Sequence, residues 1–104
     1  MDRIVERGIL YDFYGELLTS HQKKIYEALV YNDMSLSEIA GEYDISRQAA
    51  HDLIKRCDRL LENYESKLHL VNKFQIIKNR VEEIGQLTED VKIRQLAGKI
   101  LEEM

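Results

Sequence analysis

The stretch SLSEIAGEYDISRQAAHDLIKR, residues 35–56, decides the fold of this chain. Ser35 and Glu38 have the spacing of a capping box, which marks the start of a short helix. Ser46 is a favourable N-cap for a second helix, and Asp44 lies in the short segment between the two. Two short helices joined by such a turn are typical of a helix-turn-helix, and three unrelated short helices are the alternative.

The interior of this motif is predicted from its apolar positions. We expect Ala40 at the crossing of the two helices, because a methyl group lets their backbones approach closely. Asp44 stands at the turn position often held by glycine, and Asp adopts a left-handed backbone conformation more readily than most residues. The other predicted packing positions are Ile39, Ile45, Ala50, Leu53 and Ile54.

The outward face of the second helix carries the candidate functional residues. Arg pairs with guanine and Gln with adenine in the major groove, so Arg47, Gln48 and His51 are predicted to contact bases. Basic residues nearby would bind phosphates and position the protein without recognising sequence. The candidates for this role are Lys23, Lys24, Lys55, Arg56 and Arg59. An ordinary solvated helix face has the same composition, and that interpretation stays open.

The charge of the chain predicts modest affinity for DNA. Its net charge is −4, whereas nonspecific affinity for duplex DNA comes largely from basic residues. Residues 46–60 carry four basic residues against Asp52 and Asp58, a small local excess of positive charge. Glu38, Glu42 and Asp44 add negative potential close to the predicted DNA face.

The remainder of the chain is also predicted to be helical. It contains no proline and five glycines, which favours long helices and an all-α fold over a β-rich one. We expect a first helix over residues 2–18 and a capping box at Thr19 and Gln22. We predict two domains: residues 1–66 hold the N-terminal helix and the helix-turn-helix, and residues 67–104 form a helical arm.

The predicted arm follows directly from the second helix of the motif. Its apolar stripe changes phase between residues 66 and 72, which indicates a break or kink there. Gly85 is the expected end of the next helix, and Thr88 the expected cap of the last one. Apolar steps of three and four suit a helix-to-helix seam between two chains, and a homodimer is expected. The stripes could instead fold back onto the N-terminal helices. The predicted dimerisation residues are Leu70, Phe74, Ile77, Val81, Ile84, Ile93 and Ile100.

Several functional classes receive no support from the sequence. There is no apolar run long enough for a membrane span, and the first residues, MDRIVERG, do not resemble a secretory signal. His21, His51 and His69 do not combine with Cys57 in any zinc-binding spacing, and Cys57 lies on an apolar stripe as a buried thiol would. No nucleophile–base pair or phosphate-binding loop appears. We therefore expect a cytoplasmic protein that is not an enzyme and needs no metal or cofactor.

Several motifs carry a resemblance to known families. LTSHQKKI at residues 18–25, SLSEIA at 35–40 and ISRQA at 45–49 resemble region 4 of bacterial sigma factors, over about residues 17–65. The whole chain resembles the small YlxM-type helix-turn-helix family, through MDRIVERGILYDFYGELLTSHQKKI at residues 1–25 and SRQAAHDLIKR at 46–56. This resemblance implies an association with the bacterial signal recognition particle and a regulatory role.

Two hypotheses about function follow. In the first, the chain is a DNA-binding regulatory protein that uses the face described above. In the second, it is an accessory protein that acts through protein or ribonucleoprotein contacts with the signal recognition particle. The overall negative charge and the family resemblance favour the second, and the capped outward helix favours the first.

Overall fold

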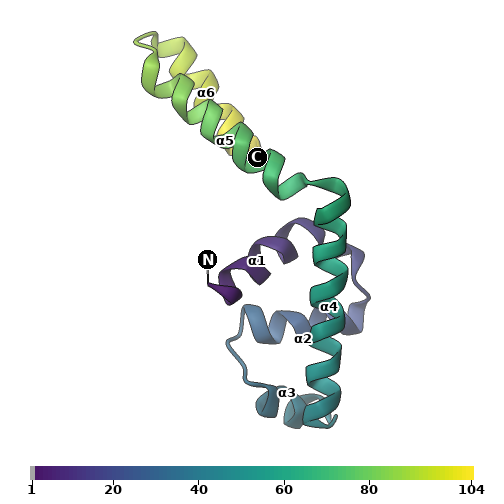
Figure 1. Cartoon of the computed structure of the whole chain (residues 1–104). Coiled ribbons are helices and arrows are strands. Elements are labelled where there is room, and N and C mark those ends of the chain that lie inside the picture. The colour runs from purple at the N-terminus through teal and green to yellow at the C-terminus, as the bar shows by residue number, and fades with distance from the viewer. Residues whose placement is uncertain (1) are drawn as a thin grey trace. The chain divides into compact units, whose positions relative to one another are not determined.

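The computed structural model describes residues 2–104, which form six α-helices and one short 3-10 helix, with no strand among them (Figure 1). The helices are α1 (Arg3–Tyr14), η1 (Gly15–Leu17), α2 (Ser20–Val30), α3 (Leu36–Tyr43), α4 (Arg47–Leu68), α5 (Leu70–Leu87) and α6 (Val91–Glu103). The predicted all-α fold with long C-terminal helices is confirmed. None of these helices combines the length and the hydrophobicity needed for a bilayer span. The chain divides into two compact units, one ending at Leu68 and the other spanning His69–Met104.

The starts of the first unit's helices follow from their caps. In the capping box before α2, the Gln22 amide donates to Thr19 Oγ1 at 3.2 Å, and the Thr19 amide donates to Gln22 Oε1 at 2.9 Å. Ser35 and Glu38 form the same reciprocal pair before α3. Ser46 Oγ accepts a hydrogen bond from the Ala49 amide at 3.0 Å, which satisfies a free donor at the start of α4. All three predicted caps are confirmed.

Helices α3 and α4 form the predicted helix-turn-helix. Asp44 ends α3 in the left-handed conformation, with φ 54° and ψ 48°. The amides of Asp44 and Ile45 both donate to the carbonyl oxygen of Ala40, so the reversal closes the exposed end of α3. The chain therefore passes from α3 to α4 in three residues, as a helix-turn-helix requires.

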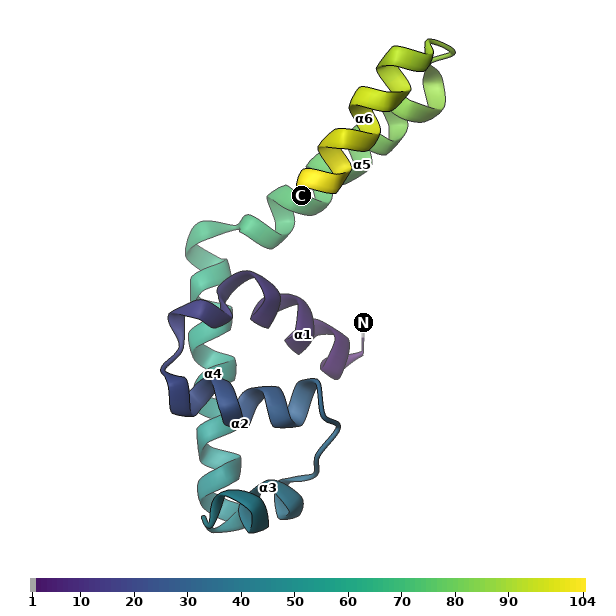
Figure 2. The same ribbon diagram turned by 180° about the vertical axis from the view of Figure 1, so that it is seen from behind.

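The core of the first unit is built along α4, against which α1, α2 and α3 all pack (Figures 1 and 2). Ile25, Tyr26 and Ile39 are completely buried. Among the small residues, Ala28 and Ala50 are completely buried, whereas Ala40, which we expected at the helix crossing, is only partly buried. The other buried apolar residues of this unit are Leu10, Tyr11, Tyr14, Leu18, Ile54, Cys57 and Leu61.

The long helix α4 ends at Leu68, within the predicted break. His69 adopts a left-handed conformation with φ 57°, which no residue of an α-helix can have. Helix α5 then begins at Leu70. The change of phase in the apolar pattern therefore marked a real interruption of the helix.

The second unit consists of α5 and α6, which run antiparallel, side by side (Figure 2). Val81 and Ala97 are its buried apolar residues, each 6% exposed. Gly85 does not end α5, contrary to our prediction: a Cβ placed on it would lie 3.8 Å from the Ala97 Cβ, so Gly85 lies where the two helices approach each other.

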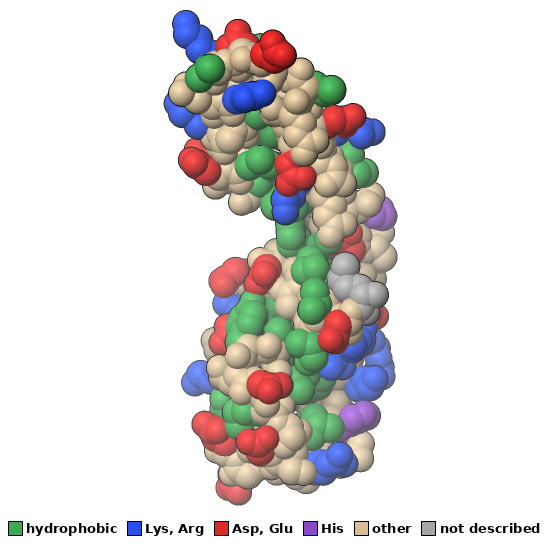
Figure 3. Space-filling view, turned by 90° about the vertical axis from the view of Figure 1, so that its left-hand side faces the viewer, with side chains coloured by type: hydrophobic (Ala, Val, Ile, Leu, Met, Phe, Trp, Pro, Cys, Tyr) green, Lys and Arg blue, Asp and Glu red, His purple; other side chains and the backbone are tan. Residues whose placement is uncertain are grey.

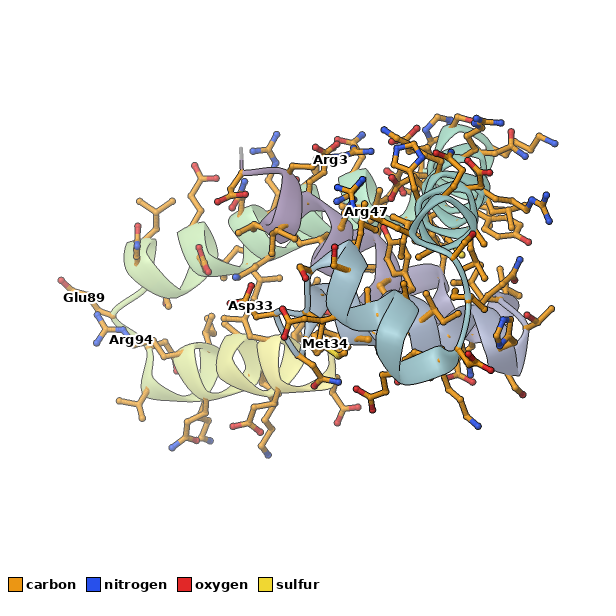
Figure 4. The ribbon with its side chains drawn as sticks, turned by 90° about the horizontal axis from the view of Figure 1, so that it is seen from below. Arg3, Asp33, Met34, Arg47, Glu89 and Arg94 are labelled. Carbon is orange, nitrogen blue, oxygen red and sulfur yellow. The ribbon has the colours of Figure 1, made fainter. Side chains whose placement is uncertain are left out.

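The turn between α5 and α6 corrects a second prediction. Asp90, and not Thr88, caps α6, because its carboxylate accepts from the amides of Lys92 and Ile93. Thr88 Oγ1 instead accepts from the Asp90 amide at 3.1 Å. Arg94 Nε donates to the Thr88 carbonyl at 2.8 Å, which ties the turn to the first part of α6, and Figure 4 shows Arg94 at this end of the hairpin.

Candidate nucleic-acid interface

The first turns of α4 carry the side chains predicted to contact bases. Arg47 is the first residue of α4, directly after the turn and its Ser46 cap, and it is labelled in Figure 4. Its side chain is exposed, and among residues 2–104 it forms no hydrogen bond or ion pair. Because helix-turn-helix proteins contact base edges through the N-terminal residues of their second helix, Arg47 has a suitable position for this role.

The other two candidate base contacts share one acidic partner. Gln48 Nε2 donates to Asp52 Oδ1 at 2.9 Å, and His51 Nδ1 lies 3.6 Å from the same oxygen. All three residues are exposed. Gln48 must therefore exchange its hydrogen bond with Asp52 for contact with a ligand, whereas Arg47 has no such bond to give up.

Four of the five candidate phosphate contacts are exposed and make no ion pair within the described residues: Lys24, Lys55, Arg56 and Arg59. Lys23 differs, because its Nζ lies 2.9 Å from Glu16 Oε2 and its side chain is only 27% exposed. Lys23 is therefore the least available of the five candidates for contact with a phosphate.

The residues on α4 form a row. Arg47, His51, Lys55 and Arg59 follow one another at intervals of four, so each is the neighbour of the next on the helix surface, and the row winds by about 120° around α4 over its length. Twelve residues of helix rise about 18 Å, so the row is long enough to follow several phosphates of a nucleic-acid strand. In the space-filling view of Figure 3, basic side chains gather along one edge of the first unit.

Asp58 does not belong to this surface, although we counted it there. It is 4% exposed and lies inside the first unit. Arg7 binds it in a bidentate pair, with Nε 3.0 Å from Oδ1 and Nη2 2.8 Å from Oδ2. Arg3 adds a third contact to Oδ2 at 3.1 Å, and the Tyr26 hydroxyl donates to Oδ1 at 2.7 Å. The cluster joins α1, α2 and α4.

The environment of Asp58 holds it in the charged form. Burial alone would raise the pKa of a carboxyl, but the hydrogen bonds from Arg7 and Tyr26 outweigh it and leave the pKa of Asp58 below its ordinary value. Burial, together with the hydrogen bond to Asp58, raises the pKa of the Tyr26 hydroxyl. The carboxylate is thus neutralised internally and does not oppose the basic residues on the outer face of α4.

The sequence contained a signal for Asp58 that its charge concealed. Ile54, Cys57, Asp58 and Leu61 are spaced three, one and three residues apart, which places all four on one face of a helix. An acidic residue within an apolar stripe requires a buried partner. Arg7 and Tyr26, far away in the sequence, could be assigned as its partners only from the tertiary structure.

Cys57 also lies on this buried face. The residue is completely buried, and burial raises the pKa of its thiol to about 11. The predicted buried thiol is confirmed, and Cys57 acts as a small apolar core residue.

Acidic residues border the basic row at its N-terminal end. Asp44 and Glu42 are exposed at the end of α3, and Asp52 lies on α4 itself. The Glu38 side chain accepts from the Ser35 amide, so part of its charge interacts with the helix start. The candidate face therefore combines a positive row with a negative border.

The family of the chain is evident from comparison with known proteins. Residues 1–102 match the model of the UPF0122 family, described as "Putative helix-turn-helix protein, YlxM / p13 like". A UPF0122 protein of Thermoanaerobacter pseudethanolicus is 44% identical over 93 residues, covering 89% of this chain and 80% of the relative.

Two further relatives agree. A UPF0122 protein of Halalkalibacterium halodurans is 45% identical over 91 residues, covering 88% of this chain and 81% of the relative. One of Acetivibrio thermocellus is 49% identical over 84 residues, covering 81% and 72%. With the helix-turn-helix formed by α3 and α4, these matches show that the chain belongs to the UPF0122 family of YlxM/p13-like helix-turn-helix proteins.

Proposed function

We propose that this protein is a non-enzymatic, DNA-binding regulatory protein of the cytoplasm. Helix α4 enters the major groove, where Arg47 contacts a base edge with help from Gln48 and His51. Phosphates are held by Lys24, Lys55, Arg56 and Arg59, with Lys23 as a minor contributor. The observation that carries the proposal is the exposed, unpaired Arg47 at the start of a helix whose N-terminus is fixed by a tight turn.

The charge on the outer face supports this function better than the sequence suggested. With Asp58 neutralised inside the protein, residues 46–60 present four basic side chains to solvent against Asp52 alone. The first unit nevertheless carries the whole net charge of −4. Binding is therefore expected to be modest and to weaken steeply with salt, because counterion release supplies much of the affinity.

Selection from a pool of random duplexes at several salt concentrations tests the proposal. The wild-type chain is expected to enrich one sequence class. Arg47→Ala should lower the preference for that class by about 1–3 kcal/mol, because the Arg contact with a base edge is lost. Arg59→Ala should weaken binding to all sequences alike and lower the salt slope by about one.

A matched control is Arg80→Ala. Arg80 is exposed on α5, and its replacement by alanine removes the same charge outside the proposed face. It should leave sequence preference unchanged. Absence of any enriched sequence, or equal effects of Arg47→Ala and Arg80→Ala, would count against DNA recognition.

Dimerisation is part of the proposal. Two recognition helices in one dimer raise the effective affinity of a protein whose DNA-binding face carries only a small positive excess, because the second contact becomes intramolecular. We propose that the second unit joins two copies, which would give DNA sites with two related halves.

A second candidate is an accessory function in the signal recognition particle pathway, through contact with its protein or RNA. The favouring observation is that Asp52 engages both Gln48 and His51, with Glu42 and Asp44 close to the same end of the helix-turn-helix. Asp52→Asn distinguishes the candidates. It should tighten DNA binding in the first case, and it should weaken capture of the particle's protein in the second if the acidic border is the contact.

A further inference from the structure

The second unit has little interior of its own. Among its described residues Val81 and Ala97 are the buried apolar ones, and both side chains are small. Large apolar side chains remain exposed on both helices, including Ile77 at 50%, Ile84 at 50% and Ile100 at 47%. Figure 3 shows hydrophobic side chains reaching the surface of this unit. A helix pair with so small an interior needs further burial to be stable.

Four of the exposed isoleucines lie on one face of the helix pair. In α5, Ile77 and Ile84 stand four residues before and three after the buried Val81. In α6, Ile93 and Ile100 stand four residues before and three after the buried Ala97.

Each of these offsets turns a side chain about 40–60° from the buried direction, in the same sense. Because α5 and α6 are antiparallel, the same offset on both helices places the two rows on the same face of the pair. We call Ile77, Ile84, Ile93 and Ile100 the isoleucine face.

We propose that the isoleucine face binds the isoleucine face of a second copy of this chain, so that two helix pairs form one four-helix bundle. The inference rests on the two-copy form of the function proposed above and names the surface that creates it. Val81, which the sequence suggested as part of the seam, is instead buried inside each pair.

The spacing and length of the face favour this occupant. Both rows step by seven residues, the interval that keeps apolar side chains along a helix-to-helix seam. Helices α5 and α6, of 18 and 13 residues, are about 27 Å and about 20 Å long, so each pair offers a seam of two to three heptads. Four helices around such a core form a common stable arrangement.

The charge of the second unit also favours self-association. Residues 69–104 carry six basic and six acidic side chains and have no net charge. Two copies can therefore approach without the repulsion that two acidic first units would experience, and a strongly charged partner gains no attraction to this unit. Ten exposed large apolar residues in the unit would be unfavourable for an isolated chain.

Sedimentation equilibrium of the full chain, without DNA, tests the inference. The wild type should show a concentration-dependent mass that approaches twice 12.3 kDa. Ile77→Glu should raise the dissociation constant by about a hundredfold or more, because two-fold symmetry buries two glutamates and each costs about tenfold or more. Ile100→Glu, on the other helix, should act in the same way.

Ile76→Glu is the matched control. Ile76 is the neighbouring isoleucine of the same helix and is 48% exposed, but one residue step turns it about 100° away from Ile77. The Ile76→Glu chain should still form the dimer with the helix content of the wild type. The dissociated Ile77→Glu chain should lose no more helix content, measured by circular dichroism, than α5 and α6 contribute.

Three outcomes would overturn the inference: a wild type that stays at 12.3 kDa, equal dissociation by Ile76→Glu and Ile77→Glu, or a monomeric wild type that Ile77→Glu merely makes easier to unfold. The last would mean that the chain covers its own isoleucine face. If the chain selects DNA in an Arg47-dependent way but does not dimerise, only this inference is overturned. If the chain dimerises but selects no DNA sequence, only the proposed DNA recognition is overturned.

Discussion

At the scale of single residues, Asp58 is the most informative position. It is an acid within an apolar stripe, and its carboxylate receives hydrogen bonds from Arg3, Arg7 and Tyr26. A buried ion pair adds little net stability compared with a well-packed apolar pair, but removal of one partner leaves a buried charge without compensation. Asp58 therefore makes the packing of α1 against α4 depend on one carboxylate.

Replacement of Asp58 by Asn should destabilise the protein by about 2–3 kcal/mol, somewhat less than the loss for a fully buried pair. The discount reflects Arg7, whose side chain is 15% exposed and can recover some hydration. Urea unfolding measures the change. Glu62→Gln is the control, because Glu62 contacts the same Arg3 at 3.2 Å but lies at the surface, where such a pair contributes about 0–1 kcal/mol. Equal losses in the two variants would contradict the assigned burial.

The pH dependence of stability should follow from the lowered pKa of Asp58. In the unfolded chain the pKa of this carboxyl is about 3.9, and in the folded protein its pKa is below that value. The stabilisation is therefore complete above the unfolded pKa and is lost as pH falls through the folded pKa. The gap in unfolding free energy between wild type and Asp58→Asn should be constant near neutral pH and shrink below about pH 4. Parallel pH curves for the two proteins would refute this assignment.

At the scale of elements, glycines show how the helices are joined and packed. Gly15 begins the 3-10 helix after α1, and a Cβ there would lie 2.8–2.9 Å from the ring of Tyr11. That ring cannot move freely, since it stacks on Tyr26 at 5.7 Å and its hydroxyl donates to Glu27 at 2.7 Å. Gly85 lies inside α5, where the nearest atom to an added Cβ is 3.8 Å away.

Alanine substitutions at these two glycines should have opposite effects. Gly15→Ala should destabilise the first unit by about 1–3 kcal/mol, because the new methyl group overlaps a fixed aromatic ring. Gly85→Ala should stabilise the second unit by about 0.5–1 kcal/mol, since a helix-interior glycine is less favourable than alanine and the added Cβ would make ordinary van der Waals contact with Ala97. Thermal unfolding of both variants provides the measurement. Destabilisation by Gly85→Ala would show that α5 and α6 approach more closely than 3.8 Å at this point.

At the scale of the whole molecule, the two units differ in how they are stabilised. The first has an interior that includes completely buried Ile25, Tyr26, Ile39 and Leu61 and a satisfied polar cluster. The second, in a single chain, buries Val81 and Ala97 and leaves its isoleucine face exposed. Stability of the second unit is therefore expected to depend on association, and that of the first is not.

Hydrogen exchange should reveal this difference. Amides of α5 and α6 are expected to become more protected as protein concentration rises, because dimerisation stabilises only the folded helix pair. Amides around Cys57 and Leu61 in α4 should show protection that does not change with concentration. Ile77→Glu should abolish the concentration dependence and Ile76→Glu should preserve it. A dependence that is the same in both units would indicate a different interface.

Local features of the sequence determined much of the fold. The caps at Thr19, Ser35 and Ser46 could be predicted because each acts on amides two or three residues away. The left-handed turn at Asp44 and the break before α5 could be predicted for the same reason. The backbone preference of a residue and the spacing of apolar residues along a helix both depend only on residues close in the sequence. The exposed position of Arg47 follows from the turn at Asp44 and the cap at Ser46, which set the first residues of α4.

Only the tertiary structure decided which residues meet across the chain. Asp58 binds Arg7, 51 positions away, and no local pattern specifies such a partner, so its charge was wrongly assigned to the surface. Gly85 was mistaken for a helix end, because a glycine that ends a helix and one inside a helix look alike in sequence. Local hydrogen bonds fix where helices begin, whereas burial and ion pairing depend on distances that the fold alone creates.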